Sequence, residues 1–311
     1  LLCLDRLPFW RTLLEELGCA VVLSEETNRR IAQEGTDLTV AEPCFPIRVA
    51  HGHVARLLDL GVERVLVPNV LNAEATPDAV ESHFCPWAQT LPFVLQSVPR
   101  LREAREKILA PTVHFRLGEA HVADDLLPLG RSLGATPAGV RRAVARAFAA
   151  QRTFREGLEE AGRSALAALQ ASGEGGIVLL GRAYNLYDRT VNLDIPAKLR
   201  EYYGINLIPL DCLPLADLDI RDVHDGMYWH SGRRIIAAGK LAGRHPALHL
   251  IYLTNFKCGP DSYVKHFLAE ACGRPFLTLQ FDGHGNDAGF LTRCEAYLDS
   301  KGMLRWWRRA A

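Results

Sequence analysis

Hydrophobic positions along the chain alternate between short continuous runs and helical spacing. In the last third, apolar runs typical of buried strands are followed by segments with apolar residues three and four apart; these runs are GIVLLG, INLIPL, HLIYLT and PFLTLQF. The first third shows a shorter alternation, with predicted strands at CAVVLS, DLTVA and ERVLVPN. Helices are predicted there over SEETNRRIAQEG, with Ser24 as its N-cap, and over RVAHGHVARLLDLG. Such alternation indicates βαβ units and parallel sheets.

Residues 97–172 have a different pattern from the segments on either side. They show long helical periodicity, above all from Thr136, where a Thr-Pro pair marks a helix start, to Ala171, just before SGEGG. The sequence therefore predicts an α/β protein with two Rossmann-like parallel-sheet domains, residues 1–96 and 173–311. A helical connector, residues 97–172, is expected to join them.

Composition limits the class of partner. The 311 residues carry 36 basic and 36 acidic side chains, so the formal net charge is zero. Neither nucleic acid nor a membrane is expected as a partner, because there is no basic excess and no apolar run near the roughly 18–20 residues of a membrane span. We see no signal peptide, and we expect reduced thiols and a cytoplasmic location. The opening LLCLDRLPFW lacks an initiator Met, and we expect a domain of a larger polypeptide.

Three cysteines stand where a predicted strand gives way to a turn. Cys44 lies in AEPCFPIR, Cys85 in SHFCPWAQ and Cys258 in TNFKCGPDS, each within two residues of a proline that stiffens the turn. Ligands of open α/β sheets bind beyond the carboxyl ends of strands, so these thiols are candidate metal ligands. For any one of them alone, simple packing explains the residue equally well. For the other five cysteines we expect packing in the protein interior: Cys3, Cys19, Cys212, Cys272 and Cys294. Of these, Cys212 is the one reserve candidate for a metal ligand.

Cysteine thiolates in such turns are suitable ligands for an iron–sulfur cluster. A cubane is held by cysteine thiolates, and the positive end of a helix favours its net negative charge. Three ligands would leave one iron open for chemistry. The sequence has no Cys-x-x-Cys pair, no P-loop and no Gly-x-Ser-x-Gly elbow, so no zinc ribbon, P-loop nucleotide site or esterase nucleophile is predicted. A zinc site made from the same thiols stays open.

Five sequence blocks carry a resemblance to a known family. They are EPCFPIRVAHGHV, GRAYNLYDRTVNLDIPAKL, IPLDCLP, TNFKCGPDS and AGFLTRCEAYLDS. Together they resemble the domain found in large proteins related to activators of 2-hydroxyacyl-CoA dehydratases and, more distantly, the dehydratase subunits. The resemblance implies Rossmann-like domains around a [4Fe–4S] cluster, with Cys44, Cys85 and Cys258 at the matching ligand positions. A related branch carries a double-cubane cluster, and this arrangement and a dimer are left open.

The resemblance also implies a partner and a reaction class. In those proteins the domain accompanies an ATPase domain, so we expect an ATP-binding activator domain or subunit, on the same parent polypeptide. The expected function is that of an oxygen-sensitive iron–sulfur redox protein. It would receive low-potential electrons from the activator and reduce a substrate or relay the electron. Whether the chain is itself an enzyme stays open. The alternatives are a non-catalytic regulatory or docking module of an activator, or a zinc-binding domain.

Polar residues near these cysteines are candidates for a place beside the cluster or in a cleft. Arg48 would balance cluster charge, and His51 and His53 diverge by about 200° on a helix, so only one of them can face a cluster. A solvated or packed side chain explains each of the three equally well. Asp261 and Ser262 are expected to cap a helix. The remaining candidates are Tyr184, Asn185, Asp188, Asn192, Lys198, Asn255, Gly259 and His284.

Overall fold

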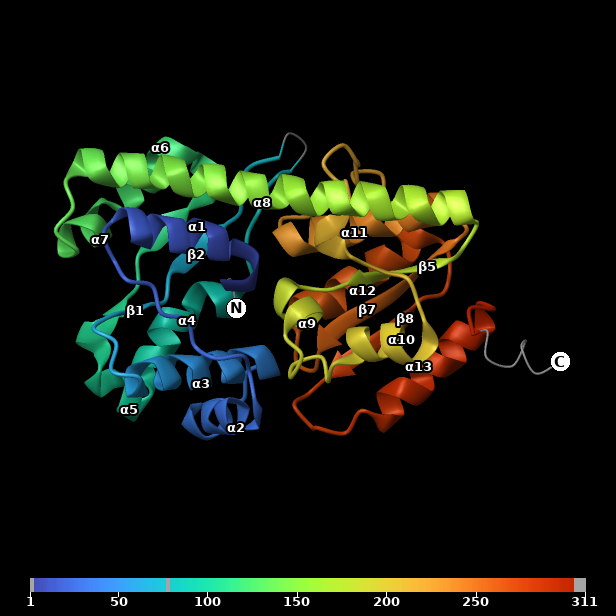
Figure 1. Ribbon diagram of the computed structural model, residues 1–311, viewed down its shortest axis with the longest axis horizontal. Coiled ribbons are helices and arrows are strands. Elements are labelled where there is room, and N and C mark those ends of the chain that lie inside the picture. Colours follow the sequence, from blue (N-terminus) through green and yellow to red (C-terminus); the bar gives the residue numbers. More distant parts are fainter. Residues whose placement is uncertain (1–2, 77–78, 305–311) are drawn as a thin grey trace. The chain divides into compact units, whose positions relative to one another are not determined.

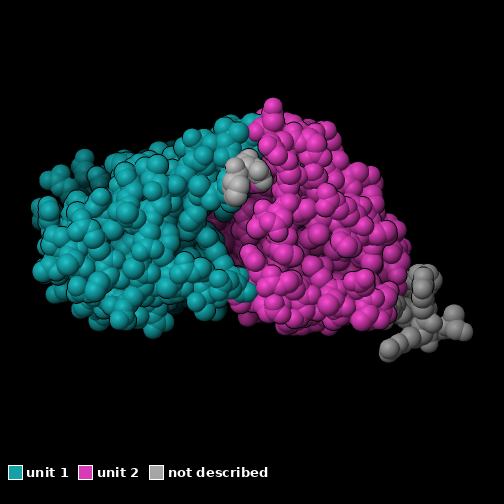
Figure 2. All heavy atoms as spheres, turned by 90° about the horizontal axis from the view of Figure 1, so that it is seen from above, with its two compact units in different colours: residues 1–156, 226–230 teal, residues 157–225, 231–311 magenta. Residues whose placement is uncertain are grey.

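The computed structural model describes residues 3–76 and 79–304, which form a helix-rich α/β protein (Figure 1). Internal contacts divide the chain into two compact units, coloured separately in Figure 2. Unit 1 is residues 1–156 and 226–230, and unit 2 is residues 157–225 and 231–311. The 36-residue helix α8 (Pro137–Ser172) contributes to both.

Unit 1 contains two small parallel sheets. Strand β1 (Val65–Leu66) pairs with β3 (Ile108–Leu109), and β2 (Asn69–Asn72) pairs with β4 (Thr112–His114). The other elements are helices: α1 (Cys3–Glu16), α2 (Arg29–Leu38), α3 (Phe45–Asp59), α4 (Pro86–Ser97), α5 (Pro99–Glu103), α6 (Glu119–Asp125) and α7 (Leu127–Ser132), with 3₁₀ turns η1 (Arg105–Lys107) and η2 (Phe115–Leu117).

Two hydrophobic clusters form the core of unit 1. One packs α1 and α6–α8 against β2 and β4, with Phe9 and Phe115 in T-shaped contact at its centre. The other packs α3, α4 and α5 against β1 and β3. The core of this unit is therefore formed mainly by helices that pack against short strands.

Unit 2 contains one continuous parallel sheet. Its strands are β5 (Gly176–Leu180), β6 (Leu207–Pro209), β7 (Leu248–Asn255) and β8 (Leu277–Phe281), in the order β6-β5-β7-β8. All five residues of β5 and seven of the eight in β7 are buried, as expected for strands covered on both faces. The helices are α9 (Ala183–Tyr187), α10 (Ile195–Tyr203), α11 (His230–Arg244), α12 (Gly259–Cys272) and α13 (Ala288–Ser300), with the 3₁₀ turn η3 (Leu210–Cys212).

The order of these strands creates a topological switch point. The chain leaves β5, forms β6 on one side of it, and then returns to form β7 on the other. Connections that diverge from adjacent parallel strands leave a crevice outside their carboxyl ends, where open α/β sheets bind ligands. Cys258 follows β7 at this position.

The structure confirms an α/β protein with parallel strands but not two Rossmann-like domains. The predicted strands at CAVVLS and DLTVA are wrong: residues 19–28 have no regular structure, and Val22 and Val40 are exposed. Helix α2 begins after Asn28 instead of Ser24, and the Asn28 Oδ1 atom accepts a hydrogen bond from the Ile31 amide at 3.1 Å. Residues 97–136, expected to be helical, also contain β3 and β4.

Candidate functional site

Cys44, Cys85 and Cys258 share one local geometry. Each occupies the N-cap of a helix, α3, α4 or α12, and each helix has proline in its first two positions. This confirms the predicted helix starts at Cys44 and Cys258, and it adds a helix start at Cys85, where a loop was expected. Cys44 and Cys258 are each 7% exposed, and Cys85 is partly exposed.

The turns at Cys44 and Cys85 belong to unit 1 and begin two helices of one hydrophobic cluster. Cys44 and Ile47 pack in the same cluster as Leu91 and Leu95 of α4. The Cys85 turn is held by neighbouring backbone, because His83 donates its N–H to the Tyr228 carbonyl and accepts from the His230 amide, at 2.8 and 3.0 Å. Both turns are therefore parts of a packed structure instead of loose loops.

A close helix crossing positions α3. A Cβ atom on Gly35 would lie 2.0 Å from the Arg48 carbonyl oxygen, and one on Gly52 would lie 2.0 Å from that of Ile31. Helices α2 and α3 thus touch backbone to backbone, which only glycine permits. This crossing holds the helix that carries Cys44 at its start.

The Cys258 turn in unit 2 departs from ordinary backbone geometry. Lys257 has φ of +66°, in the left-handed region that residues other than glycine seldom adopt. The turn is closed by hydrogen bonds from the Phe256 amide to the Phe281 carbonyl, at 2.7 Å, and from the Cys258 amide to the Asn255 carbonyl, at 3.1 Å. Backbone strain of this kind is common at functional sites, where the surrounding structure maintains it.

A buried ion pair lies beside this turn. Arg182, the second residue after β5, donates from Nη2 and Nε to the Asp261 Oδ1 atom at 2.8 and 3.2 Å. The second carboxylate oxygen accepts from the Thr254 hydroxyl at 2.6 Å, and Asp261 is only 2% exposed. Asp261 lies in the first turn of α12 as expected, and both of its carboxylate oxygens are engaged, by Arg182 and by Thr254. Ser262 donates from its hydroxyl to the Cys258 carbonyl at 2.9 Å.

Three buried asparagines extend the polar network of unit 2. Asn255 donates to the Asn185 side-chain oxygen, and Asn185 donates to the Leu253 carbonyl at 3.1 Å. Asn192 donates to the Asn185 carbonyl at 2.9 Å. The structure thus brings together these three candidates around the carboxyl ends of β5 and β7.

Other polar candidates of unit 2 are less central. Tyr184 is partly buried on α9, and the Asp188 Oδ1 atom accepts from the amides of Thr190 and Val191 at 3.0 Å. Lys198 donates to the Leu193 carbonyl at 2.8 Å and pairs with Asp287 at 2.5 Å.

Two further candidates of unit 2 flank the sheet. The side chain of His284 is largely exposed, beside Asp282. Gly259 begins α12, and a Cβ atom there would meet nothing within 4 Å.

The candidates on α3 have different environments. His51 is fully buried, and its Nδ1 atom donates to the Ile47 carbonyl at 2.8 Å, while Nε2 has no hydrogen-bond partner among the described residues. Burial lowers the pKa of His51, which favours the neutral imidazole. His53 lies between the hydroxyls of Ser24 and Thr27, at 2.8 and 2.9 Å. The Arg48 guanidinium lies 5.3 Å from the Phe45 ring centre.

The remaining described cysteines fit a packing role. Cys272 and Cys294 are buried within α12 and α13, and burial raises the pKa of Cys294 to about 12. Burial also raises the pKa of Cys19 and of Cys212, the latter with a further contribution from Asp211. No disulfide joins the cysteines from Cys19 onward that the structure describes, and the Cys3 side chain lies outside the described residues.

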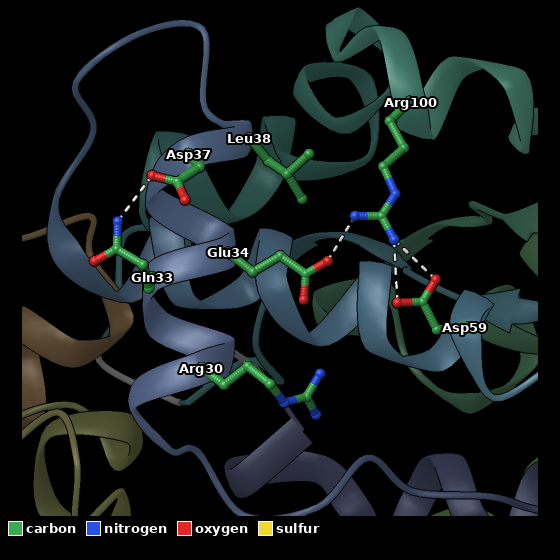
Figure 3. A pocket seen from close by; sticks show the side chains of 7 residues that line it. All are labelled: Arg30, Gln33, Glu34, Asp37, Leu38, Asp59 and Arg100. Carbon is green, nitrogen blue, oxygen red and sulfur yellow. Dashed lines mark hydrogen bonds and ion pairs between the residues drawn. The ribbon is translucent and has the colours of Figure 1, made fainter.

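A hollow on the surface of unit 1 has none of the predicted residues in its walls (Figure 3). Arg100 reaches across it to Glu34 and Asp59, at 2.6 and 2.8 Å, and both contacts are open to solvent. Its walls carry three carboxylates, Glu34, Asp37 and Asp59, and Arg100 is shared between two of them. The other lining residues are Arg30, Gln33, Asp37 and Leu38.

Comparison with known families supports the resemblance found in the sequence. The family described as CoA enzyme activase uncharacterised domain (DUF2229) matches residues 1–213, well over half of the chain. The chain belongs to this family. In this activase-family chain, Cys44 and Cys85 lie within the matched residues, and Cys258 lies beyond them. No curated protein and no solved structure matches the chain.

Within residues 3–76 and 79–304 of this activase-family chain, no helix is both long enough and apolar enough to cross a membrane.

Proposed function

We propose that this activase-family chain is an iron–sulfur redox protein whose cluster is held by Cys44, Cys85 and Cys258. The observation that supports the proposal best is the repeated geometry of the three residues. Each is the N-cap of a helix of 12 to 15 residues, with a proline at the first or second helical position. The other described cysteines lie within helices, in the turn η3 or, for Cys19, in irregular backbone, without this combination.

The donor set suits a [4Fe–4S] cluster. Cysteine thiolates are its usual ligands, and a cluster with three thiolates carries net negative charge. At each N-cap, the free N–H groups of the first helical turn carry partial positive charge, apart from the proline, which has no N–H. A single cubane and a double-cubane cluster are both compatible with thiol ligands, and we propose the single cubane.

The surroundings of the thiols favour ligands that are held in place before the cluster binds. In unit 1 the Gly35–Gly52 crossing fixes α3, and in unit 2 the Arg182–Asp261 pair fixes the start of α12. Supports of this kind keep ligands oriented and tune the bound metal. Burial of Cys44 and Cys258 would keep water from the sulfur atoms.

The family suggests where the electrons come from. We propose that an ATP-dependent activator domain or subunit, on the same parent polypeptide, supplies them, and that the chain transfers them to a substrate or to a further acceptor. When bound, the cluster would supply one-electron chemistry, while this chain's residues hold and shield it. We further propose a cytoplasmic, oxygen-poor setting, because reduced thiols and such clusters require it.

Anaerobic purification with analysis of iron and acid-labile sulfide tests the ligands. We expect iron and sulfide in the wild type and a loss of most of both in Cys44→Ser, Cys85→Ser and Cys258→Ser. Cys19→Ser, a partly buried cysteine away from any helix start, is the matched control and should keep the wild-type content. Iron that survives all three substitutions, or zinc in place of iron, would overturn the proposal.

A second experiment tests the electron source. The anaerobic protein is mixed with a purified activase, a reductant and ATP, and the visible absorbance of the cluster is followed. Bleaching that requires both ATP and activase is expected. If the absorbance is unchanged in wild-type protein with full iron content, the activator is not the donor.

A further inference from the structure

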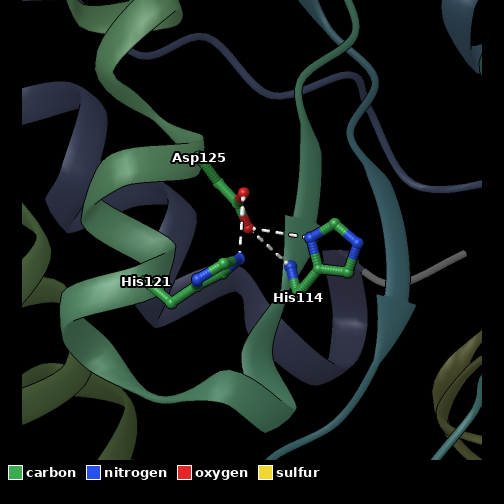
Figure 4. A group of neighbouring side chains, drawn as sticks. All are labelled: His114, His121 and Asp125. Carbon is green, nitrogen blue, oxygen red and sulfur yellow. Dashed lines mark hydrogen bonds and ion pairs between the residues drawn. The ribbon is translucent and has the colours of Figure 1, made fainter.

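Two histidines and an aspartate lie together in unit 1, outside the three cysteine turns. Figure 4 shows His121 and Asp125 on α6 and His114 at the end of β4, with the three side chains directed toward one another. One potential ligand atom from each residue can be chosen so that all three lie within 4.8 Å of one another. Neither the sequence resemblance nor the matched family assigns a role to this group.

The chain builds this group by folding back on itself. After β4, the turn η2 ends at Gly118, whose φ of +88° suits glycine and lets α6 begin alongside the strand. His121 and Asp125 are four residues apart, so they share one face of the helix. Val113 and Val122 anchor the strand and the helix in the same hydrophobic cluster. The backbone positions are therefore fixed by packing beneath the polar group.

The carboxylate is oriented by the strand that carries His114. The Asp125 Oδ2 atom accepts from the His114 backbone amide at 2.9 Å and lies 3.0 Å from the ring Nδ1 atom of the same residue. Its Oδ1 atom lies 3.6 Å from His121 Nε2. A ligand carboxylate held by a hydrogen bond from outside the coordination shell is typical of metal sites.

These distances are close to those of a coordination shell. A tetrahedral Zn²⁺ ion with bonds of about 2.0–2.1 Å places its ligand atoms about 3.3 Å apart. His114 Nδ1 lies 3.0 Å from Asp125 Oδ2, and His121 Nε2 lies 3.6 Å from the other carboxylate oxygen, Oδ1. With one ligand atom from each residue, all pairs lie within 4.8 Å. Rotation of His121 can shorten its distances to the other two ligand atoms, because its side chain is the most exposed of the three.

We propose that His114, His121 and Asp125 bind a divalent transition-metal ion such as Zn²⁺. Two imidazoles and one carboxylate favour such an ion over Ca²⁺ or Mg²⁺, which prefer oxygen ligands. Three protein ligands on a partly exposed surface leave a position for water or for a ligand atom from outside. His114 would bind through Nδ1 in the tautomer that carries its proton on Nε2. The ion would join β4 to α6.

Co²⁺ binding to the full chain tests this proposal, because its visible spectrum reports the ligands. We expect one Co²⁺ bound with d–d bands and no thiolate charge-transfer band, and displaced by Zn²⁺. His121→Ala should lower the Co²⁺ affinity on the order of tenfold or more, with an unchanged circular dichroism spectrum, since this side chain is exposed. Asp125→Asn should also weaken binding.

His284→Ala is the matched control. His284 is an exposed histidine beside one carboxylate, Asp282, and no second histidine joins it among the described residues, so the Co²⁺ affinity should not change. Equal Co²⁺ affinity in the wild type and in His121→Ala would overturn the proposal. The role of Asp125 would then be only its structural hydrogen bond to His114. Cobalt d–d bands that are the same in the wild type, His121→Ala and Asp125→Asn would overturn it too. The iron content of His121→Ala is expected to equal that of the wild type. The proposed metal site and the proposed cluster are therefore tested independently of each other.

Discussion

The two units support their cysteine turns by different physical means. In unit 2 the turn at Cys258 follows a long central strand, and buried charges and amides hold it: Arg182 with Asp261, and Asn185 with Asn255. In unit 1 the strands are two to four residues long, and the turn at Cys44 depends on the backbone contact between α2 and α3. The comparison teaches that one geometry, a cysteine at a helix start, can rest on polar contacts or on steric fit.

Removal of the buried carboxylate in unit 2 should have the largest effect. Asp261→Ala leaves the buried guanidinium of Arg182 without its ion pair, so the free energy of unfolding should fall by about 3–5 kcal/mol. Urea titration measures this change. Arg163→Ala, which removes an exposed ion-pair partner on α8, is the control and should change it by less than about 0.5 kcal/mol.

The double variant Arg182→Met, Asp261→Leu separates the two contributions to this loss. Because it removes both charges and keeps apolar volume, it should be more stable than Asp261→Ala. If the double variant is the less stable of the two, the ion pair itself stabilises unit 2 more than we infer.

Unit 1 has a buried arginine as well, Arg6, and its carboxylate partner Glu74 should make the stability of this unit depend on acid. Arg6 is fully buried, with its guanidinium 3.9 Å from the Phe115 ring centre, and it donates to both carboxylate oxygens of Glu74. Burial raises the pKa of Glu74, but the opposing effect of Arg6 and Arg155 is larger. The pKa of Glu74 therefore lies well below its ordinary value. The ionised carboxylate is therefore favoured in the folded state.

The pH dependence of Glu74→Gln follows from this shift. A carboxyl with a lowered folded-state pKa contributes stability above its unfolded pKa, about 4.5, and loses that contribution as the pH falls further. We expect Glu74→Gln to cost about 2–3 kcal/mol near neutral pH, less than Asp261→Ala because Glu74 is partly open to solvent. The difference from the wild type should shrink below about pH 4.5. A constant difference across this range would show that charge is not the cause.

The helix crossing in unit 1 should be sensitive to a single methyl group. Gly52→Ala would place Cβ against the Ile31 carbonyl, so α2 and α3 must move apart, at a cost of about 1–3 kcal/mol. Gly157→Ala on α8 is the matched control, because a Cβ there meets nothing within 4 Å and alanine favours helix by about 1 kcal/mol. Urea titration should show opposite signs. A stable Gly52→Ala variant would mean that the crossing is not tightly packed.

The same difference explains how far the sequence alone predicts the fold. The four strands of unit 2 were predicted because each is a continuous apolar run, and its helices have ordinary periodicity. In unit 1, CAVVLS has the composition of a strand, yet it lies in an irregular segment in which Val22 and Leu23 are exposed. Pairing of a short strand depends on distant neighbours, which local composition does not contain.

The candidate residues follow a similar rule. The helix starts at Cys44 and Cys258 were visible from proline and from the helical spacing that follows. Arg182 was missed, since its partner Asp261 lies 79 positions away. Its place directly after a strand was the available signal. His121 and Asp125 show the i, i+4 spacing of one helix face, whereas the approach of His114 depends on the turn at Gly118.

The smallest expected effect concerns the cap of α2, the helix whose start was predicted at Ser24. Asn28→Ala removes the side-chain oxygen that accepts from the Ile31 amide, so unit 1 should lose about 1 kcal/mol of unfolding free energy. Asn28→Gly should lose only a few tenths, since glycine is tolerated at an N-cap. Urea titration of both variants checks this difference. If both cost the same, α2 is held by its contact with α3 alone, and steric fit would dominate unit 1 even more strongly than the comparison with unit 2 indicates.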